Sequence, residues 1–184
     1  MVEVVVVDEA GEPLVGELWP LYQSVFGDFE DAGAWRQQVW ERHAARAGFR
    51  LALARDGGAL VGFAYGYTGE HGQWWTDHAA AVLHPDVASD WLGGHFELVS
   101  IGVDEAARGT GVARRLLARL TDGLDHSRWV LMTSADPDDP ARRLYRSTGW
   151  AVIGPGLSQD KVIMGRAWPR IAACRSAISG PWLG

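Results

Sequence analysis

One stretch of the chain combines a strand, a glycine-rich turn and an amphipathic helix without interruption. Residues 96–103 have the β-branched and aromatic content of a strand, and apolar residues recur at helical spacing from position 112 onward. Gly109 and Gly111 lie at the junction, where the missing side chains leave room for a ligand against the backbone. Free amides of the first helical turn, the helix dipole and Arg108 would then face a phosphate group. A plain strand-to-helix connection is the alternative, because a lone Gly-x-Gly pair is weak evidence.

The spacing of Arg108, Gly111 and Ala113 resembles the acetyl-coenzyme A signature of the GNAT acetyltransferase superfamily. A Walker motif is excluded because no Gly-Lys-Ser/Thr follows, and the missing third glycine excludes a dinucleotide fingerprint. The resemblance implies that acetyl-coenzyme A is bound by the strand end, the turn and the first helical turn. The implied cofactor-binding residues are Ile101, Gly102, Val103, Arg108, Gly109, Thr110, Gly111, Val112, Ala113 and Arg114.

A second block resembles the other motif of the same family. Residues 128–133 read as a buried strand, residues 134–140 as an Asp/Pro-rich loop, and residues 141–150 as a short helix closed by Gly149. Asp138 stands where the family usually has Asn, and we include it among the cofactor-binding residues. Over residues 2–168 the resemblance implies an α/β fold in one domain, with a mixed central sheet of about six to seven strands, a splayed central strand pair and flanking helices.

The chemistry of amine acetylation indicates two catalytic residues. An acceptor amine is mostly protonated at neutral pH, so a base must remove its proton and an acid must protonate the departing thiolate. Glu97 is a charged residue in an otherwise apolar strand, at the position where the family resemblance implies a glutamate base. Tyr145 matches the tyrosine that the second motif implies as the general acid. His95, two residues before Glu97 on the same strand face, is the reserve base.

Each of these roles has a structural alternative. Glu97 at a strand end would face solvent, or would bind the substrate ammonium without taking its proton. A Leu-Tyr pair on an amphipathic helix, such as the pair that contains Tyr145, is more often part of a core.

The composition limits the class of protein. The 184 residues, 47% of them hydrophobic, suit one globular domain with its own core. The net charge of −6, without any run of Lys or Arg, argues against nucleic acid as a partner. Cys174, the only cysteine, cannot form an internal disulfide. We expect no signal peptide and no membrane span, and the cytoplasm is the expected compartment.

Charge is distributed unevenly along the chain. Residues 1–35 contain eight acids and no Lys or Arg, whereas eight of the sixteen arginines lie between Arg108 and Arg146. Cations suit the phosphates of coenzyme A, and acids suit an amine acceptor. The alternative is that an arginine-rich composition, with one Lys against sixteen Arg, simply places arginine on every solvated face.

The remaining elements complete one domain. We predict a strand at 2–7, a helix ending near 26, a second helix capped by Asp31, a hairpin formed by 49–55 and 60–67, and final strands at 150–153 and 161–168. The domain covers 1–168, and 169–184 form a tail. Residues 68–95 are a Trp- and His-rich insertion, which we interpret as a substrate lid or as a partly helical cover of the sheet. Its histidines match no metal-ligand spacing, so no metal is expected.

These observations predict an acetyl-coenzyme A-dependent N-acetyltransferase that works by direct attack within a ternary complex. The acidic first segment and the aromatic insertion favour a small cationic amine as the acceptor. The alternatives are acetylation of a protein N-terminus or lysine, and a binding protein that senses acyl-coenzyme A without turnover. A homodimer is a possible assembly that the resemblance implies.

Overall fold

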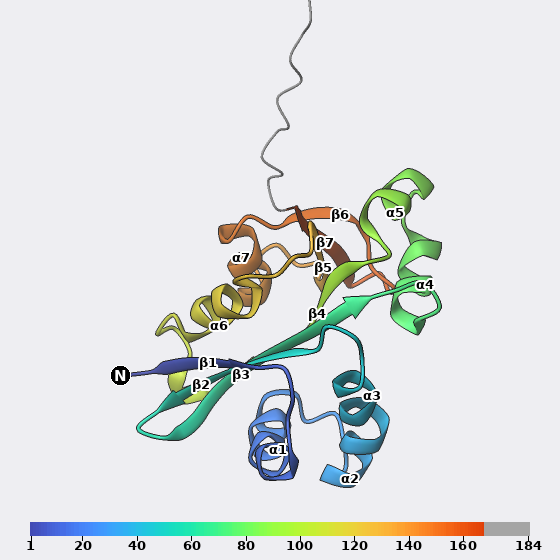
Figure 1. The fold of residues 1–184 in the computed structure, drawn as a ribbon. Helices are drawn as coiled ribbons and strands as arrows, with labels where there is room; N and C mark the ends of the chain where they lie inside the picture. Colours follow the sequence, from blue (N-terminus) through green and yellow to red (C-terminus); the bar gives the residue numbers. More distant parts are fainter. Residues whose placement is uncertain (168–184) are drawn as a thin grey trace, which may run out of the picture.

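The computed structural model describes residues 1–167, and its centre is a seven-stranded mixed sheet in the order β1-β2-β3-β4-β5-β7-β6 (Figure 1). All neighbouring strands are antiparallel except β4 and β5, which are parallel. The predicted mixed sheet is therefore confirmed. The strands are β1 (Glu3–Val7), β2 (Arg50–Asp56), β3 (Ala59–Gly69), β4 (His95–Val103), β5 (Arg128–Ser134), β6 (Ala151–Pro155) and β7 (Lys161–Ala167).

Within residues 1–167, seven α-helical segments flank this sheet. They are α1 (Glu12–Phe26), α2 (Ala32–Trp35), α3 (Glu41–Ala44), α4 (Trp74–Val82), α5 (Pro85–Trp91), α6 (Val112–Thr121) and α7 (Pro140–Ser147). A π-helical segment, Arg36–Trp40, joins α2 to α3. Asp31 caps α2 as predicted, because its side chain accepts a hydrogen bond from the Ala34 amide at 2.8 Å. The helix α6, expected from the apolar spacing after position 112, ends at Thr121, just before Gly123 with its left-handed φ of 71°.

The two faces of the sheet are covered by different helices. On one side α6 and α7 pack against the sheet, with Leu116, Leu117 and Leu120 of α6 fully buried against Phe96 and Leu98 of β4. On the other side α1, α2 and α3 cover the half of the sheet that β1, β2 and β3 form (Figure 1). This second core is mostly aromatic. Its buried rings include Tyr22, Trp35, Trp40, Phe49, Phe63, Tyr65 and Tyr67.

The parallel strands β4 and β5 pair only over a short distance. Their ladder contains two residue pairs, Phe96 with Trp129 and Glu97 with Val130. Further along, a bulge at Val99 shifts the register of β4 against β3. The edge of β4 that faces β5 is thus without a strand partner beyond Glu97, within the part of the chain that the structure describes. The predicted splayed strand pair is confirmed.

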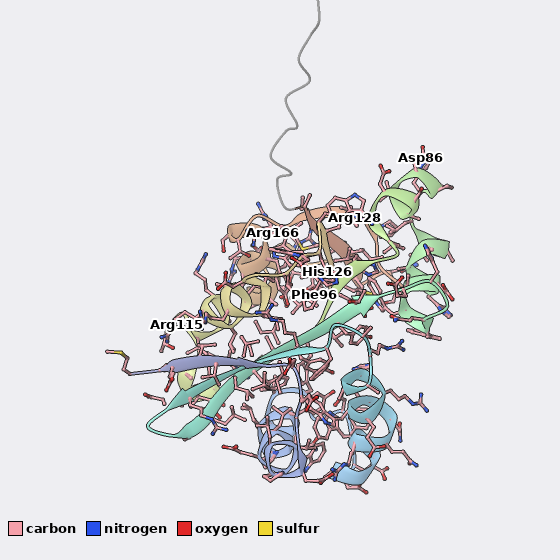
Figure 2. The ribbon with its side chains drawn as sticks, viewed as in Figure 1. Asp86, Phe96, Arg115, His126, Arg128 and Arg166 are labelled. Atoms are coloured by element: carbon pink, nitrogen blue, oxygen red, sulfur yellow. The ribbon has the colours of Figure 1, made fainter. Side chains whose placement is uncertain are left out.

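The predicted insertion at residues 68–95 contains the two helices α4 and α5, while its first two residues end β3 and His95 begins β4. They cover the face of β5 and β7, where Ala79 and Leu83 pack with Val130 and Ile163. Arg128, at the start of β5, donates hydrogen bonds to the carbonyls of Asp90 and Gly93 and so ties the end of the insertion to the sheet (Figure 2).

These contacts fit the interpretation of the insertion as a partly helical cover, and a substrate lid stays a prediction. The tail at 169–184, with Cys174, lies outside the described residues. Within residues 1–167 there is no helix with the length and apolar character that crossing a membrane requires.

Candidate active site

The end of β4 that diverges from β5 borders a cavity of about 640 Å³. It lies between the end of β4, the turn after it, and the first turns of α6 and α7, and Val25 of α1 closes one side. Nine of the eleven predicted cofactor-binding residues line it. They are Ile101, Gly102, Val103, Arg108, Gly109, Gly111, Val112, Ala113 and Arg114. The structure therefore brings into one place residues that sequence reasoning had grouped by motif.

The N-terminus of α6 points free amides toward this cavity. Gly111 is the N-cap residue, and no side chain caps the helix. Gly109 and Gly111 have left-handed φ angles of 76° and 84°, which disfavour any residue with a Cβ. A Cβ built on either glycine would meet no atom within 4 Å, so both glycines face open space. Uncapped amides and the helix dipole beside open space form an anion-binding arrangement.

The arginines at the cavity are partly held by the protein. Arg108 donates from Nε to the Val103 carbonyl at 3.2 Å, which fixes the turn against the end of β4. Arg114 donates to the Ser147 hydroxyl at 2.9 Å, which connects α6 to α7. Neither guanidinium forms an ion pair within residues 1–167. Both remain able to meet a phosphate with their other N–H groups.

The other two predicted cofactor residues lie outside this cavity. Thr110 lines a neighbouring, smaller hollow and donates its hydroxyl to the Ala107 carbonyl at 2.7 Å. Asp138 is exposed, and its amide donates to Asp136 at 2.9 Å. The next residue, Asp139, lines the cavity instead and caps α7 by accepting from the amides of Ala141 and Arg142. Roles for Thr110 and Asp138 in binding the cofactor stay predictions.

Glu97 is buried in the sheet, with 4% of its surface exposed. Its side chain lies on the face that carries Tyr67 on one neighbouring strand and Val130 on the other. The Tyr67 hydroxyl donates to Glu97 Oε1 at 3.4 Å, and Oε2 has no hydrogen-bond partner among the described residues. Burial raises the pKa of Glu97 to about 7, against the opposing effects of the Tyr67 hydrogen bond and the Arg46 charge. A carboxyl group with this pKa can accept a proton near neutral pH.

His95 is fully buried on the same strand. Its Nδ1 accepts a hydrogen bond from the Gly93 amide at 3.2 Å, and Nε2 is without a partner in the described chain. Burial lowers the pKa of His95 to about 4, and the nearby Arg128, His126 and His71 add to this effect. The ring is therefore neutral at physiological pH, and its reserve role stays a prediction.

Tyr145 lies on α7 with 5% of its surface exposed, next to Leu144, which lines the cavity. Its ring contacts Trp150, with the centroids 5.9 Å apart. Burial, and to a smaller extent Asp139, raises the pKa of the phenol. The phenol is therefore protonated at neutral pH, as a proton donor must be. Tyr145 does not itself line the described cavity.

A group of polar residues around Glu97 escaped sequence reasoning. Tyr65 and Tyr67 lie two residues apart on β3 and so face the same side of the sheet. The Tyr65 hydroxyl shares a hydrogen bond with His43 Nδ1 at 3.0 Å, and the Arg46 guanidinium lies 5.2 Å from the centre of the Tyr67 ring. The alternation of the tyrosines was a visible signal. No sequence signal placed His43 or Arg46 beside them.

Glu97 occupies a seam between two helical covers. Tyr67 belongs to the core under α1, α2 and α3, whereas Val130 belongs to the core under α4 and α5. Both flank Glu97 on one face of the sheet. The side chain of Glu97 therefore lies where the cores under the two groups of helices meet. As for metals, no group of three or more His, Cys, Asp or Glu side chains within residues 1–167 is arranged to hold an ion.

The sequence of the chain is similar to those of known acetyltransferases. The model of the acetyltransferase (GNAT) family matches residues 14–150. The GCN5-like protein acetyltransferase Rv2170 of Mycobacterium tuberculosis (strain ATCC 25618 / H37Rv) is 34% identical over 122 residues, which are 60% of this chain and 59% of that protein. The chain thus matches only about six tenths of the length of this curated relative.

Solved structures share the fold at low sequence identity. The ribosomal-protein-S18-alanine N-acetyltransferase of Escherichia coli superposes with a TM-score of 0.60 at 17% identity, over 91% of this chain and 94% of that one. A GNAT-family acetyltransferase of Streptococcus agalactiae 2603 gives a TM-score of 0.63 at 11% identity, over 91% and 96% of the two chains. At these identities the likeness concerns the fold alone.

Proposed function

Because the chain belongs to the GNAT family of acetyltransferases, we propose that it transfers an acetyl group from acetyl-coenzyme A to a primary amine by direct attack in a ternary complex. The observation that carries this proposal is the cavity at the splayed strands. The unpaired edge of β4, the uncapped first turn of α6 and the open space at Gly109 and Gly111 all meet there. These features suit an elongated anionic ligand.

The residues of the cavity fit acetyl-coenzyme A, which supplies the activated acetyl group when it is bound. The amides of Val112 and Ala113 would hold the pyrophosphate, together with the guanidinium of Arg108. The backbone of Ile101 and Val103 would bind the pantetheine arm as an added strand would.

Glu97 would remove the proton from the acceptor ammonium. This role is supported by the burial of the carboxyl group, which raises its pKa to about 7, and by Oε2, which has no partner in the described chain. Tyr145 would protonate the departing thiolate, which its protonated phenol and its place beside the cavity-lining Leu144 support. An intact base also argues against a sensor without turnover.

The acceptor is expected to be a small molecule whose amine is protonated, and therefore cationic, when it binds. Glu97 in the seam suits an ammonium. The acids of residues 1–35 attract a cationic acceptor less than the sequence suggested, because Glu12 pairs with Arg36 and Glu17 with Arg55 on the surface. The cytoplasm and a homodimer stay the expected location and assembly.

A protein acceptor is the second candidate. It is favoured by two similar proteins, a GCN5-like protein acetyltransferase and a ribosomal-protein-S18-alanine N-acetyltransferase. Coenzyme A release with a panel of small amines, compared with release with peptides that offer a free N-terminus or a lysine, separates the two candidates.

A pair of glycine variants tests the cofactor site. Gly111→Asp places a carboxylate in the cavity, and we expect it to abolish acetyl-coenzyme A binding in calorimetry through charge and steric conflict. Gly123→Asp is the matched control, since Gly123 follows the same helix, has a similar φ of 71° and also faces open space. Unchanged affinity in folded Gly111→Asp protein, or equal losses in both variants, would contradict the proposed site.

A further inference from the structure

The side chain of Arg46 approaches the seam from the turn that follows α3. This turn is fixed by backbone hydrogen bonds on both sides: the Arg46 amide donates to the His43 carbonyl at 3.1 Å, and the Phe49 amide donates to the Arg46 carbonyl at 3.2 Å. The Thr68 amide of β3 donates to the Ala47 carbonyl at 2.8 Å and holds the turn against the sheet. Arg46 is therefore presented by a rigid part of the backbone.

Arg46 is a cation without an anionic partner. No carboxylate of residues 1–167 lies within 4.0 Å of its guanidinium, and its Nε is buried without a hydrogen-bond partner in the same part of the chain. The group interacts with the ring and the phenol of Tyr67, whose hydroxyl in turn donates to Glu97. The residue as a whole is only partly buried, so the terminal N–H groups of its guanidinium can meet the carboxylate of a ligand.

Glu97, Tyr67 and Arg46 thus form a row in which a carboxylate and a guanidinium lie on either side of a phenol. The acceptor ammonium has to reach Glu97 while Arg46 stands nearby. A purely cationic acceptor would be repelled by this guanidinium. An acceptor with a carboxylate close to its amine would instead place opposite charges at both ends of the row.

We propose that Arg46 binds a carboxylate of the acceptor, which makes the acceptor a small amino acid-like molecule with a free carboxylate near the reacting nitrogen. This inference rests on the proposed acetyl transfer and narrows its substrate class. It disfavours a polyamine, which has no anion to offer. It also disfavours a protein N-terminus, whose nearest carboxyl group is consumed in a peptide bond.

Matched acceptor pairs test the inference directly. Each pair consists of an L-amino acid and the primary amine in which hydrogen replaces its carboxylate, and turnover is followed by release of the coenzyme A thiol. For the best pair we expect the wild-type protein to favour the amino acid by about 10- to 100-fold in kcat/KM, the range of a charge-assisted hydrogen bond. Arg46→Met should remove that preference, so that the two members of each pair are used with similar kcat/KM. Arg46→Lys should retain part of it.

Controls separate recognition from general electrostatics. Arg42→Met removes an exposed arginine of α3 and should preserve the preference. If Arg46 acted only by lowering the pKa of Glu97, Arg46→Met would move the acidic limb of the pH profile upward and change both members of each pair equally. That result would overturn the inference.

Binding provides a readout that does not require turnover. Calorimetry with the same pairs, on protein saturated with coenzyme A, should show tighter binding of the amino acid to wild type and no difference in Arg46→Met. Absence of turnover with every amine and peptide would contradict the proposed function. Turnover or binding in which the carboxylate makes no difference would overturn the role of Arg46 alone.

Discussion

The carboxyl group of Glu97 is buried in the sheet and accepts a hydrogen bond from the Tyr67 hydroxyl. A charge inside an apolar strand is visible in the sequence, so Glu97 could be selected as a candidate base, and that role stays a prediction. The hydrogen bond from Tyr67 and the nearby Arg46 depend on the strand pairing and on the turn after α3, which brings together residues far apart in sequence. No local pattern encodes such a contact.

The pKa of Glu97 predicts the pH dependence of the reaction. With a value of about 7, the carboxylate form that accepts a proton increases as the pH rises through neutrality. We expect Glu97→Gln to lower kcat/KM by about 10²–10⁴, to remove this acidic limb and to leave acetyl-coenzyme A affinity unchanged. Pre-steady-state and steady-state rates should be measured across pH 5–10, a range of about five pH units that includes the acidic and the basic limb of the profile. A near-normal rate at every pH would exclude Glu97 as the base and favour His95.

The same pKa predicts that the stability of the fold falls as the pH rises, whereas the activity increases. Burial raises the pKa of Glu97 in the folded protein from the ordinary 4.5 to about 7. The contribution of the protonated carboxyl group to stability is therefore fully present below pH 4.5 and is lost as the pH rises through about 7. Above pH 7 the buried charge should cost up to about 3 kcal/mol. Urea denaturation should therefore show that Glu97→Gln gains free energy of unfolding relative to wild type between pH 4 and pH 8, a span of about four units. A constant difference over this range would show that Glu97 titrates alike in the folded and unfolded chain.

Tyr145 should act on the other limb of the profile. Its phenol is kept protonated by burial, so Tyr145→Phe removes a proton donor but leaves the base intact. We expect a slower kcat, a reduced basic limb and an unchanged acidic limb in the same pH series. Tyr22→Phe is the control, because Tyr22 is also a buried phenol of raised pKa but belongs to the aromatic core under α1. Equal effects of the two substitutions would indicate a packing role for Tyr145.

At the scale of elements, periodicity and capping signals were sufficient for the regular segments. The hairpin β2–β3, the Asp31 cap and the buried face of α6 follow the predicted pattern. The insertion was less predictable, because the buried faces of α4 and α5 are defined by contacts with β5 and β7, which are distant in sequence. Leu83 and Val130, for example, pack in the same cluster but lie more than forty positions apart. Short helices of this kind depend on tertiary packing more than on propensity.

The start of α7 carries a prediction about the second motif. Asp139 accepts hydrogen bonds from two amides at the helix N-terminus, whereas the side chain of Asp138 caps nothing and is exposed. Asp139→Ala should lower the free energy of unfolding by about 0.5–2 kcal/mol, the usual cost of a lost cap. Asp138→Ala should change it by less than about 0.5 kcal/mol, as is usual for surface positions. Urea denaturation of both variants is the measurement, and a larger loss for Asp138→Ala would reverse these roles.

At the scale of the whole molecule, strand β4 contributes residues to both parts of the proposed site. The side of β4 near Glu97 faces the seam between the helical covers, and the end of the strand at Ile101 and Val103 lines the cavity. The family resemblance predicted the splay that opens the cavity. It did not predict the seam, because the division of one sheet face between α1–α3 and α4–α5 arises from the packing of separate parts of the chain.

This arrangement predicts the kinetic order of the reaction. The proposed base Glu97 and the cavity-lining Ile101 and Val103 lie four to six residues apart on β4, roughly 13–20 Å at the rise of a strand. Acetyl-coenzyme A in the cavity would therefore leave Glu97 free to meet an amine, and we expect both substrates to be bound together. A covalent acetyl-enzyme would need a nucleophile, and the only cysteine of the sequence, Cys174, belongs to neither motif. We expect intersecting lines when both substrates are varied, and a normal kcat/KM for Cys174→Ser. Parallel lines together with loss of activity in Cys174→Ser would indicate a ping-pong reaction through that thiol, and the direct transfer that Glu97 is proposed to assist would have to be abandoned.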